Sequence, residues 1–305
     1  MVGLTVIMGC GGLGWLWISG GWLSFGSFPN KNYGKEWKKN PFPLPKSIYR
    51  LNSIDVWDKN NIFISDSDEI HYWNGNEWRA LHKTGGYLSG VKAVRPDRLV
   101  AVSVHNSKTV WVISDPKGTN TIDFDCDSLS GYAIRGERPI LGKNGEYIFG
   151  TADRTYIYKD GKTKISNAEE FFDYVYKDPK FAKFCLEAIK NASNEGYRFL
   201  FGDERLGIAG ISKETEILIV EQKDRKKTSF QMVGENPKAW KAWARSPTDF
   251  WVLSHDGTLR RTDGGRLKII SKPAVRFNDL LDVALDQKTG TVYGVSRDAI
   301  WALDD

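Results

Sequence analysis

Cysteine is scarce in this sequence, and no pair of cysteines has the spacing of a metal or redox site. Three cysteines stand among 305 residues, at Cys10, Cys126 and Cys185. They form no CxxC pair and no His/Cys cluster with zinc spacing, which excludes a zinc-finger framework and a disulfide-rich fold. One disulfide bridge and three free thiols are both compatible with this pattern.

Motifs for the common catalytic chemistries are also missing. No HxH, HExxH, Gly-x-Ser-x-Gly elbow, phosphate loop or dinucleotide fingerprint occurs. We therefore predict no catalytic residue, no cofactor and no metal site. We interpret a lone histidine as a surface residue at a strand end, and the acidic runs 66–69 and 123–127 as solvated loop charge rather than calcium ligands. The histidines are His71, His82, His105 and His255.

Charge is absent from residues 1–30 and evenly balanced over most of the chain. The net charge of +5 comes from residues 31–50, where six basic residues face one acidic residue. The remaining 255 residues carry 37 basic and 37 acidic side chains. A basic surface is the usual footprint of a nucleic-acid-binding protein, so we predict no nucleic-acid partner.

The uncharged segment 1–30 predicts a membrane anchor, a signal or a lipoprotein segment. A bilayer is spanned by about 20 mostly apolar residues, and three tryptophans suit its interfaces. Ile7-Met8-Gly9-Cys10 resembles a bacterial lipobox without its basic flank, which makes Cys10 a candidate for lipidation. Packing of the segment on the domain is the alternative. We expect a membrane-associated protein of a bacterial cell envelope, and the side of the membrane stays open.

A short apolar strand followed by a polar turn recurs along the chain. The gaps between instances are 40, 47, 60, 42 and 41 residues, and four-stranded propeller blades repeat at about 40–45 residues. Further apolar strands flank these instances. The pattern predicts an all-β, six-bladed β-propeller over residues 31–305, with seven blades as the alternative. The recurring strands begin at Ile70, Val110, Ile157, Ile217, Leu259 and Ile300.

The last repeat unit lacks its fourth strand, and a matching strand stands near the start of the chain. Gly34-Lys35-Glu36-Trp37 has the same Gly-x-x-Trp form as Gly75-Asn76-Glu77-Trp78. Pairing of residues 35–40 with 300–303 would remove two open strand edges. We therefore interpret 31–48 as a basic linker and closing strand.

The 60-residue gap contains a helical insertion, which we place at residues 167–195. Ser166-Asn167-Ala168-Glu169 has the form of a capping box, and apolar residues follow at helical spacing over 168–177 and 179–193. So much apolar surface must be covered, either by the propeller itself or by a partner. The candidate partner interface consists of Phe171, Phe172, Tyr174 and Tyr176.

Two segments resemble the BNR-repeat, or Asp-box, propellers, a group that includes sialidases. Residues 259–265 resemble the Asp-box turn, and residues 70–78 resemble the same strand-turn-strand unit. The family order Ser-x-Asp-x-Gly-x-x-Trp is incomplete, since Asp263 and Gly265 keep only its middle. The resemblance implies a propeller fold and a structural turn at Asp263 and Gly265, and it says little about activity.

These observations favour a membrane-tethered scaffold that binds a protein or another ligand. We expect an unidentified protein partner, with the membrane contacted through residues 1–30. The alternative is a propeller hydrolase that acts on glycans, as sialidases do, or on another small substrate; whether the chain is an enzyme stays open. Side chains that such chemistry would use are Arg135, Arg138, Arg276, Tyr132 and Tyr197.

Overall fold

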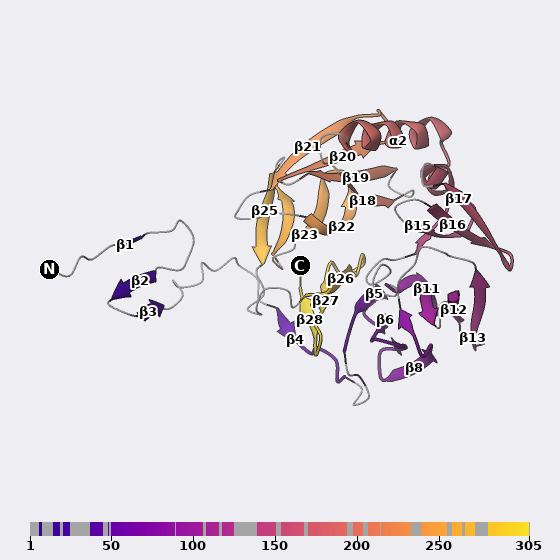
Figure 1. Ribbon diagram of the computed structural model, residues 1–305, viewed down its shortest axis with the longest axis horizontal. Coiled ribbons are helices and arrows are strands. Elements are labelled where there is room, and N and C mark those ends of the chain that lie inside the picture. The colour runs from indigo at the N-terminus through magenta and orange to yellow at the C-terminus, as the bar shows by residue number, and fades with distance from the viewer. Residues whose placement is uncertain are drawn as a thin grey trace.

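The computed structural model shows a chain built mainly from β-strands that form sheets around a common centre (Figure 1). Hydrogen-bonded neighbours within each sheet are mostly consecutive in sequence. The structure describes residues 6–7, 15–18, 21–24, 37–44, 48, 50–88, 90–105, 108–115, 118–124, 139–150, 154–167, 170–193, 198–203, 207–213, 215–232, 239–254, 258–263, 266–271 and 280–304.

The first half of the ring consists of three antiparallel arrays. One contains β5 (Ser53–Asp58), β6 (Asn61–Ser65), β7 (Glu69–Trp73) and β8 (Trp78–Lys83). The next contains β10 (Lys92–Arg95), β11 (Arg98–His105), β12 (Lys108–Asp115) and β13 (Gly118–Phe124), with β9 (Tyr87–Leu88) paired to β11. The third contains β14 (Ile140–Leu141), β15 (Tyr147–Gly150), β16 (Arg154–Lys159) and β17 (Lys162–Asn167).

The second half repeats this arrangement. One array contains β18 (Arg198–Asp203), β19 (Ile208–Lys213), β20 (Glu216–Glu221) and β21 (Lys227–Met232). A short parallel pairing joins β21 to the last strand of the next array, which contains β22 (Ala239–Ser246), β23 (Asp249–Ser254), β24 (Leu259–Asp263) and β25 (Arg266–Ser271). The final array contains β26 (Asp282–Leu285), β27 (Val292–Val295), β28 (Ile300–Leu303) and β4 (Lys38–Lys39).

The recurring strands of the sequence pattern all lie at the same place in these arrays. Each of the six instances falls on the third strand, namely β7, β12, β16, β20, β24 or β28. The second and third strands are the most apolar because sheets pack on both of their faces; β6 and β23, for example, are buried over almost their whole length. The repeat can therefore be recognised in the sequence because the third strand of each array is largely buried and so is apolar.

The first strands of the arrays lie toward the centre of the ring, where β5, β22 and β26 can be followed in Figure 1. Polar side chains connect these inner strands. Asp282 Oδ2 accepts hydrogen bonds from Ser53 Oγ at 2.6 Å and from the Ile54 backbone N–H at 3.1 Å. Lys241 Nζ on β22 lies 2.5 Å from Asp282 Oδ1. One fully buried carboxylate thus joins β22, β26 and β5.

A second carboxylate repeats the contact one array further on. Asp55 Oδ2 accepts the Ala93 backbone N–H at 2.8 Å and lies 3.2 Å from Lys92 Nζ. Ser53 Oγ accepts the Val91 backbone N–H at 3.1 Å. The inner edge of a strand carries backbone groups that have no strand partner. Side chains from the preceding array accept hydrogen bonds from these backbone groups. The contact between arrays therefore also provides partners for the unpaired strand edge.

The two ends of the described ring meet in the final array. Lys38 and Lys39 of β4 pair with Ala302 and Trp301 of β28, within the two segments expected to pair. Asn40 continues the contact, since its N–H donates to the Ile300 carbonyl at 2.7 Å and its Oδ1 accepts the Ile300 N–H at 3.1 Å. The closing strand leaves no open edge on β28.

Two helices follow β17. They are α1 (Phe171–Val175) and α2 (Pro179–Ser193). Of the capping box expected at 166–169, residues 168 and 169 lie outside the described residues, and β17 continues to Asn167. Asn167 Oδ1 accepts the Glu170 N–H at 2.9 Å, and Asn167 Nδ2 donates to Glu170 Oε1 at 3.2 Å. At the start of α2, Asp178 Oδ1 accepts the Lys180 N–H at 2.9 Å.

The apolar segment near the N-terminus contains strands in the ranges that the structure describes. These are β1 (Val6–Ile7), β2 (Trp15–Ile18) and β3 (Gly21–Ser24), which pair as an antiparallel sheet drawn apart from the ring in Figure 1. Among the described residues, no helix has the length and apolar character needed to cross a bilayer. The membrane anchor therefore stays a prediction.

Removing the Asp282 carboxylate should destabilise the whole ring. In Asp282→Ala, Lys241 loses its buried partner and the Ile54 N–H loses its acceptor, which should lower the free energy of unfolding by about 3–5 kcal/mol. Urea denaturation measures this change. The control is Asp298→Ala, whose ion pair with Lys39 is 3.6 Å long and exposed, and which should cost less than about 1 kcal/mol. Equal losses in the two variants would contradict the role of Asp282.

Helix α2 should be intolerant of charge on its inner face. Phe181 is fully buried, so Phe181→Asp should lower the free energy of unfolding by at least about 3 kcal/mol, because the aromatic packing is lost and a charge is buried. Lys183→Asp places the same charge on the exposed side of the helix and should change stability by roughly 0.5 kcal/mol or less. Thermal melting of both variants distinguishes packing on the ring from an exposed helix.

Candidate functional site

The two helices pack on the chain's own sheets. Phe172, Tyr176 and Phe181 are buried in one cluster with Ile148 of β15 and with residues of β19 and β20. The Tyr176 hydroxyl donates to the Ile208 carbonyl at 2.7 Å. Most of the apolar helical surface is therefore covered within the chain, and Phe172 and Tyr176 of the predicted interface belong to this covered part.

The other two predicted interface residues, Phe171 and Tyr174, are only partly buried. Tyr174 contacts β17, where Lys164 Nζ donates to its hydroxyl at 2.6 Å and lies 5.3 Å from its ring centroid. The hydrogen bond to Tyr174 raises the pKa of Lys164, so this side chain is cationic at neutral pH. An aromatic ring and a positive charge thus lie together at the start of the helical insertion.

A shallow, open depression of ≈ 450 Å³ lies at the same corner of the molecule. The ends of β16 and β17 and the residue before α1 form it. Its lining residues are Arg154, Lys164, Ile165, Ser166, Asn167 and Glu170. We call these six residues, with Phe171 and Tyr174, the α1 corner.

The α1 corner combines an apolar contact with two basic groups. Ile165 is 43% exposed, which makes it one of the most exposed large apolar side chains among the described residues. The Glu170 carboxylate accepts hydrogen bonds from the Ser166 hydroxyl and the Asn167 amide and adds one negative charge to the corner. Arg154 and Lys164 provide the positive charge. The geometry suits a polypeptide segment that carries an apolar side chain and a carboxylate.

The interpretation of residues 66–69 as solvated loop charge was wrong for Asp66, and that of a lone histidine as a surface residue was wrong for His71. Asp66 is 5% exposed and His71 is 1% exposed. Both lie near the turn between β6 and β7, where Asp66 Oδ1 accepts the backbone N–H groups of Asp68 and Glu69 at 3.0 and 2.8 Å. Asp66 is buried because its side chain organises this turn.

Several residues singled out from the sequence lie outside the described ranges. These are Cys10, Gly265, Tyr132, Arg135, Arg138, Tyr197 and Arg276. Asp263 ends β24, where its Cα partner is Arg266 across the turn. Backbone bonding of the kind expected of an Asp-box turn occurs at Asn74, whose Oδ1 accepts the N–H groups of Asn76 and Glu77 at 2.9 and 3.0 Å.

Sequence reasoning missed the polar groups that link the inner strands. Asp55 and Ser53 alternate with buried apolar residues in β5, and Lys241 stands in an otherwise apolar stretch of β22. A charged residue in an otherwise apolar strand was the available signal, because its burial requires a partner. Nothing in the sequence identified Asp282 as that partner of Lys241.

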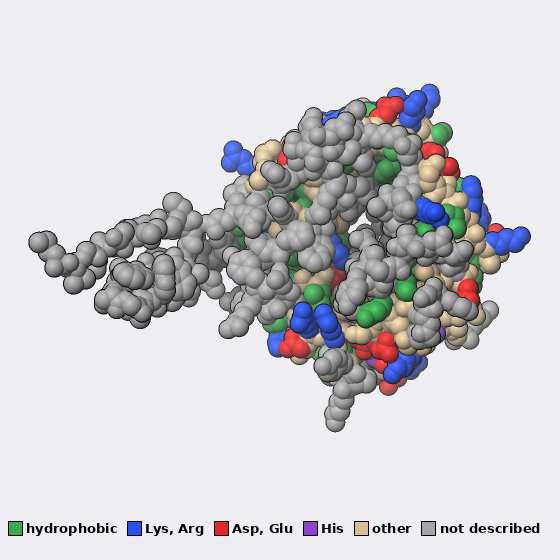
Figure 2. Space-filling model, in the orientation of Figure 1, with side chains coloured by type: hydrophobic (Ala, Val, Ile, Leu, Met, Phe, Trp, Pro, Cys, Tyr) green, Lys and Arg blue, Asp and Glu red, His purple; other side chains and the backbone are tan. Residues whose placement is uncertain are grey.

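Charge of both signs is interspersed around the edge of the ring (Figure 2). Over the surface that this view shows, Lys and Arg side chains stand beside Asp and Glu side chains. This agrees with the balanced composition of residues 51–305.

Comparison with known proteins gives a fold and no family. No protein-family model matches the chain, and no curated protein matches its sequence. A Bacteroides thetaiotaomicron protein of unknown function is 9% identical with a TM-score of 0.53, over 99% of this chain and 87% of that one. A chain of the mitotic checkpoint complex is 11% identical with a TM-score of 0.50, over 92% and 97%. The WD40 β-propeller domain of Doa1 is 9% identical with a TM-score of 0.48, over 89% and 97%.

Identities this low establish the fold alone. The four-stranded antiparallel arrays surround one centre, and their first strands lie innermost, which is the arrangement of a β-propeller. The chain therefore has a β-propeller fold.

Proposed function

We propose that this chain is a six-bladed β-propeller that serves as a protein-binding scaffold, with the α1 corner as its partner site. The blades are the array from β5 to β8 and its successors, the last of which is completed by β4. The turn at Asn74 supports a distant relation to the BNR-repeat propellers, since its side chain bonds the backbone two and three residues on.

The observation that carries the proposed function is the incomplete burial of the helical insertion. The inner face of α1 and α2 packs on the ring, whereas Phe171, Tyr174 and Ile165 keep part of their surface exposed beside two basic side chains. Aromatic and arginine side chains provide most of the binding energy in protein interfaces. An aromatic residue that is partly covered by its own chain is also already ordered, so less conformational entropy is lost on binding.

The charge of the α1 corner specifies the chemistry of the partner. Arg154 and Lys164 are the basic side chains that line the depression, and the Glu170 carboxylate beside them accepts hydrogen bonds from Ser166 and Asn167. We expect a protein segment with an acidic residue next to an apolar one. The acidic residue would meet Arg154 and Lys164, and the apolar residue would contact Ile165.

Residues 1–30 would hold this scaffold at a membrane of the cell envelope. Their lack of any charged side chain and the lipobox-like Cys10 support this part of the proposal. A tether raises the effective concentration of the propeller near partners in the same membrane.

Charge reversal at the α1 corner should abolish partner binding without unfolding the protein. Lys164 is exposed, so Lys164→Glu should change the free energy of unfolding by only about 0.5 kcal/mol. A photo-crosslinking amino acid placed at position 165 or 174 should capture the same partner in native cells. Lys164→Glu should remove that crosslink, as measured by mass spectrometry.

Two controls distinguish the α1 corner from the rest of the surface. Lys162→Glu makes the same charge change on β17 outside the depression and should keep the crosslink. A crosslinker at the exposed Lys59 of the first array should not capture the partner. Capture of the same protein at positions 59 and 165 alike would refute the proposed site.

Membrane tethering should depend on the first thirty residues alone. The full-length protein should sediment with membranes, and a variant that starts at residue 31 should stay in the supernatant. If Cys10 carries a lipid, Cys10→Ala should release the protein; a simple apolar anchor should be insensitive to that change. Recovery of the full-length protein entirely from the supernatant would disprove the tether.

A further inference from the structure

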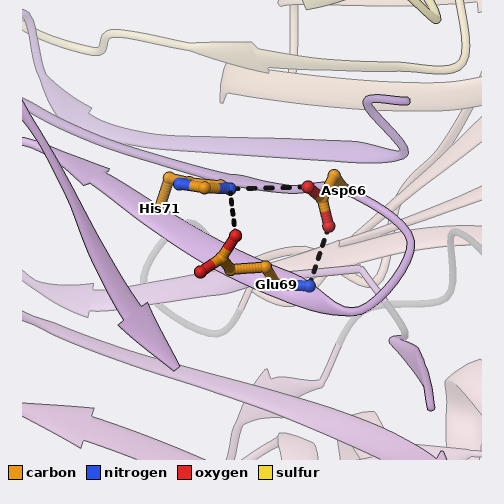
Figure 3. A group of neighbouring side chains, drawn as sticks. All are labelled: Asp66, Glu69 and His71. Atoms are coloured by element: carbon orange, nitrogen blue, oxygen red, sulfur yellow. Dashed lines mark hydrogen bonds and ion pairs between the residues drawn. The ribbon is translucent and has the colours of Figure 1, made fainter. Parts of the chain in front are cut away.

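Three side chains with metal-binding atoms converge beside the turn between β6 and β7. Asp66 is at the start of this turn, and Glu69 and His71 belong to β7. Figure 3 shows the His71 ring between the two carboxylates, with one ring nitrogen directed at Asp66 and at the Glu69 carboxylate. One oxygen of each carboxylate and one nitrogen of the imidazole lie within 4.8 Å of one another.

The backbone of the turn fixes the orientation of Asp66. Its Oδ1 accepts the N–H groups of Asp68 and Glu69, which leaves Oδ2 directed at His71. The Asp66 carboxylate is thus held in place before any ligand arrives.

His71 provides the independent sign of a ligand. Its ring is 1% exposed, and Nε2 makes no hydrogen bond to any described residue. That nitrogen lies 3.5 Å from Asp66 Oδ2 and 3.6 Å from Glu69 Oε2, whereas an N–H···O hydrogen bond measures about 2.7–3.2 Å. A buried polar atom without a hydrogen bond is costly, and here it points at two carboxylates.

The two distances from His71 Nε2 match the spacing of ligands around one ion, and the two carboxylate oxygens lie within 4.8 Å of each other. Donor atoms around a tetrahedral Zn²⁺ lie about 3.4 Å apart, because each is roughly 2.0–2.2 Å from the metal. We propose that Asp66, Glu69 and His71 bind a divalent transition-metal ion such as Zn²⁺. The imidazole nitrogen disfavours Ca²⁺ and Mg²⁺, which prefer oxygen ligands. The Glu69 side chain is 20% exposed, so water reaches the site and can fill the fourth position.

Hydrogen bonds around the cluster indicate that a bound ion would stabilise the first array. Asn52 Nδ2 donates to the Asp66 carbonyl at 2.8 Å, and the Thr84 N–H donates to the Asp68 carbonyl at 2.7 Å. The turn is thus tied both to the segment that enters β5 and to the segment that leaves β8. A bound ion would fix these three segments of the first array and stabilise the folded protein in proportion to its occupancy.

The test is Zn²⁺ binding by the full-length protein after treatment with a chelator. Isothermal titration should show one Zn²⁺ per chain at this site, and Zn²⁺ should raise the melting temperature. Glu69→Gln replaces a partly exposed ligand and should weaken Zn²⁺ binding at least tenfold, because loss of a direct ligand costs no less than loss of an outer contact. Asp66→Asn keeps an Oδ1 acceptor for the turn and should weaken binding similarly.

The control is Glu77→Gln. Glu77 stands three residues after Asn74 in a turn with the same backbone bonds, but the cluster contains neither residue. It should leave Zn²⁺ affinity unchanged. Substitution of Co²⁺ gives a second readout, since its visible bands should vanish in His71→Gln. Zn²⁺ affinity equal in the parent, Glu69→Gln and His71→Gln proteins, or no binding by a folded parent, would overturn the proposal and leave a proton shared between His71 and the carboxylates.

Discussion

The inner edge of the ring is the constraint on which the rest of the structure depends. The first strands β5 and β10 carry backbone N–H groups on an edge where no further strand pairs with them. Asp282 and Asp55 accept these groups from the next array and hold a lysine each at 2.5 and 3.2 Å. These side chains join β22 to β26, β26 to β5, and β5 to β10, strands that are not paired with one another.

Such links make the ring sensitive to the loss of one partner. A buried carboxylate that bonds a backbone N–H and a lysine stabilises the fold only while all three are present. The final array depends on the same logic at its outer edge, where β4 pairs with β28 and Asn40 bonds Ile300. Hydrogen bonds and ion pairs near the centre, together with strand pairing at the edge, therefore hold the ring closed.

Both proposed sites lie at the ends of strands of the ring. The α1 corner includes the end of β17, the last strand of its array, and the Asp66–Glu69–His71 cluster lies at a turn that two other segments of the first array hold. Strands restrain the side chains at both places, because rigid elements position a site more accurately than free loops do. The two sites differ in chemistry. The α1 corner offers apolar and basic contacts, whereas the Asp66–Glu69–His71 cluster offers carboxylates and an imidazole.

The sequence by itself determined the elements that depend on local pattern. Burial recurs along the chain, so the third strands at Ile70, Val110 and their equivalents could be read directly, and the 3.6-residue period placed α2 at 179–193. The pairing of 35–40 with 300–303 was also accessible, because an incomplete last unit needs a partner for its edge.

Tertiary structure decided which polar residues meet. Asp282 is separated from Ser53 by 229 residues and from Lys241 by 41, and strand alternation gives a side chain's face but not its partner. His71 read as a surface histidine because the sequence does not show that β7 is covered on both faces. The sequence also did not determine what covers α1 and α2. An apolar helix face must be buried, but only the tertiary structure shows that sheets of the same chain bury it.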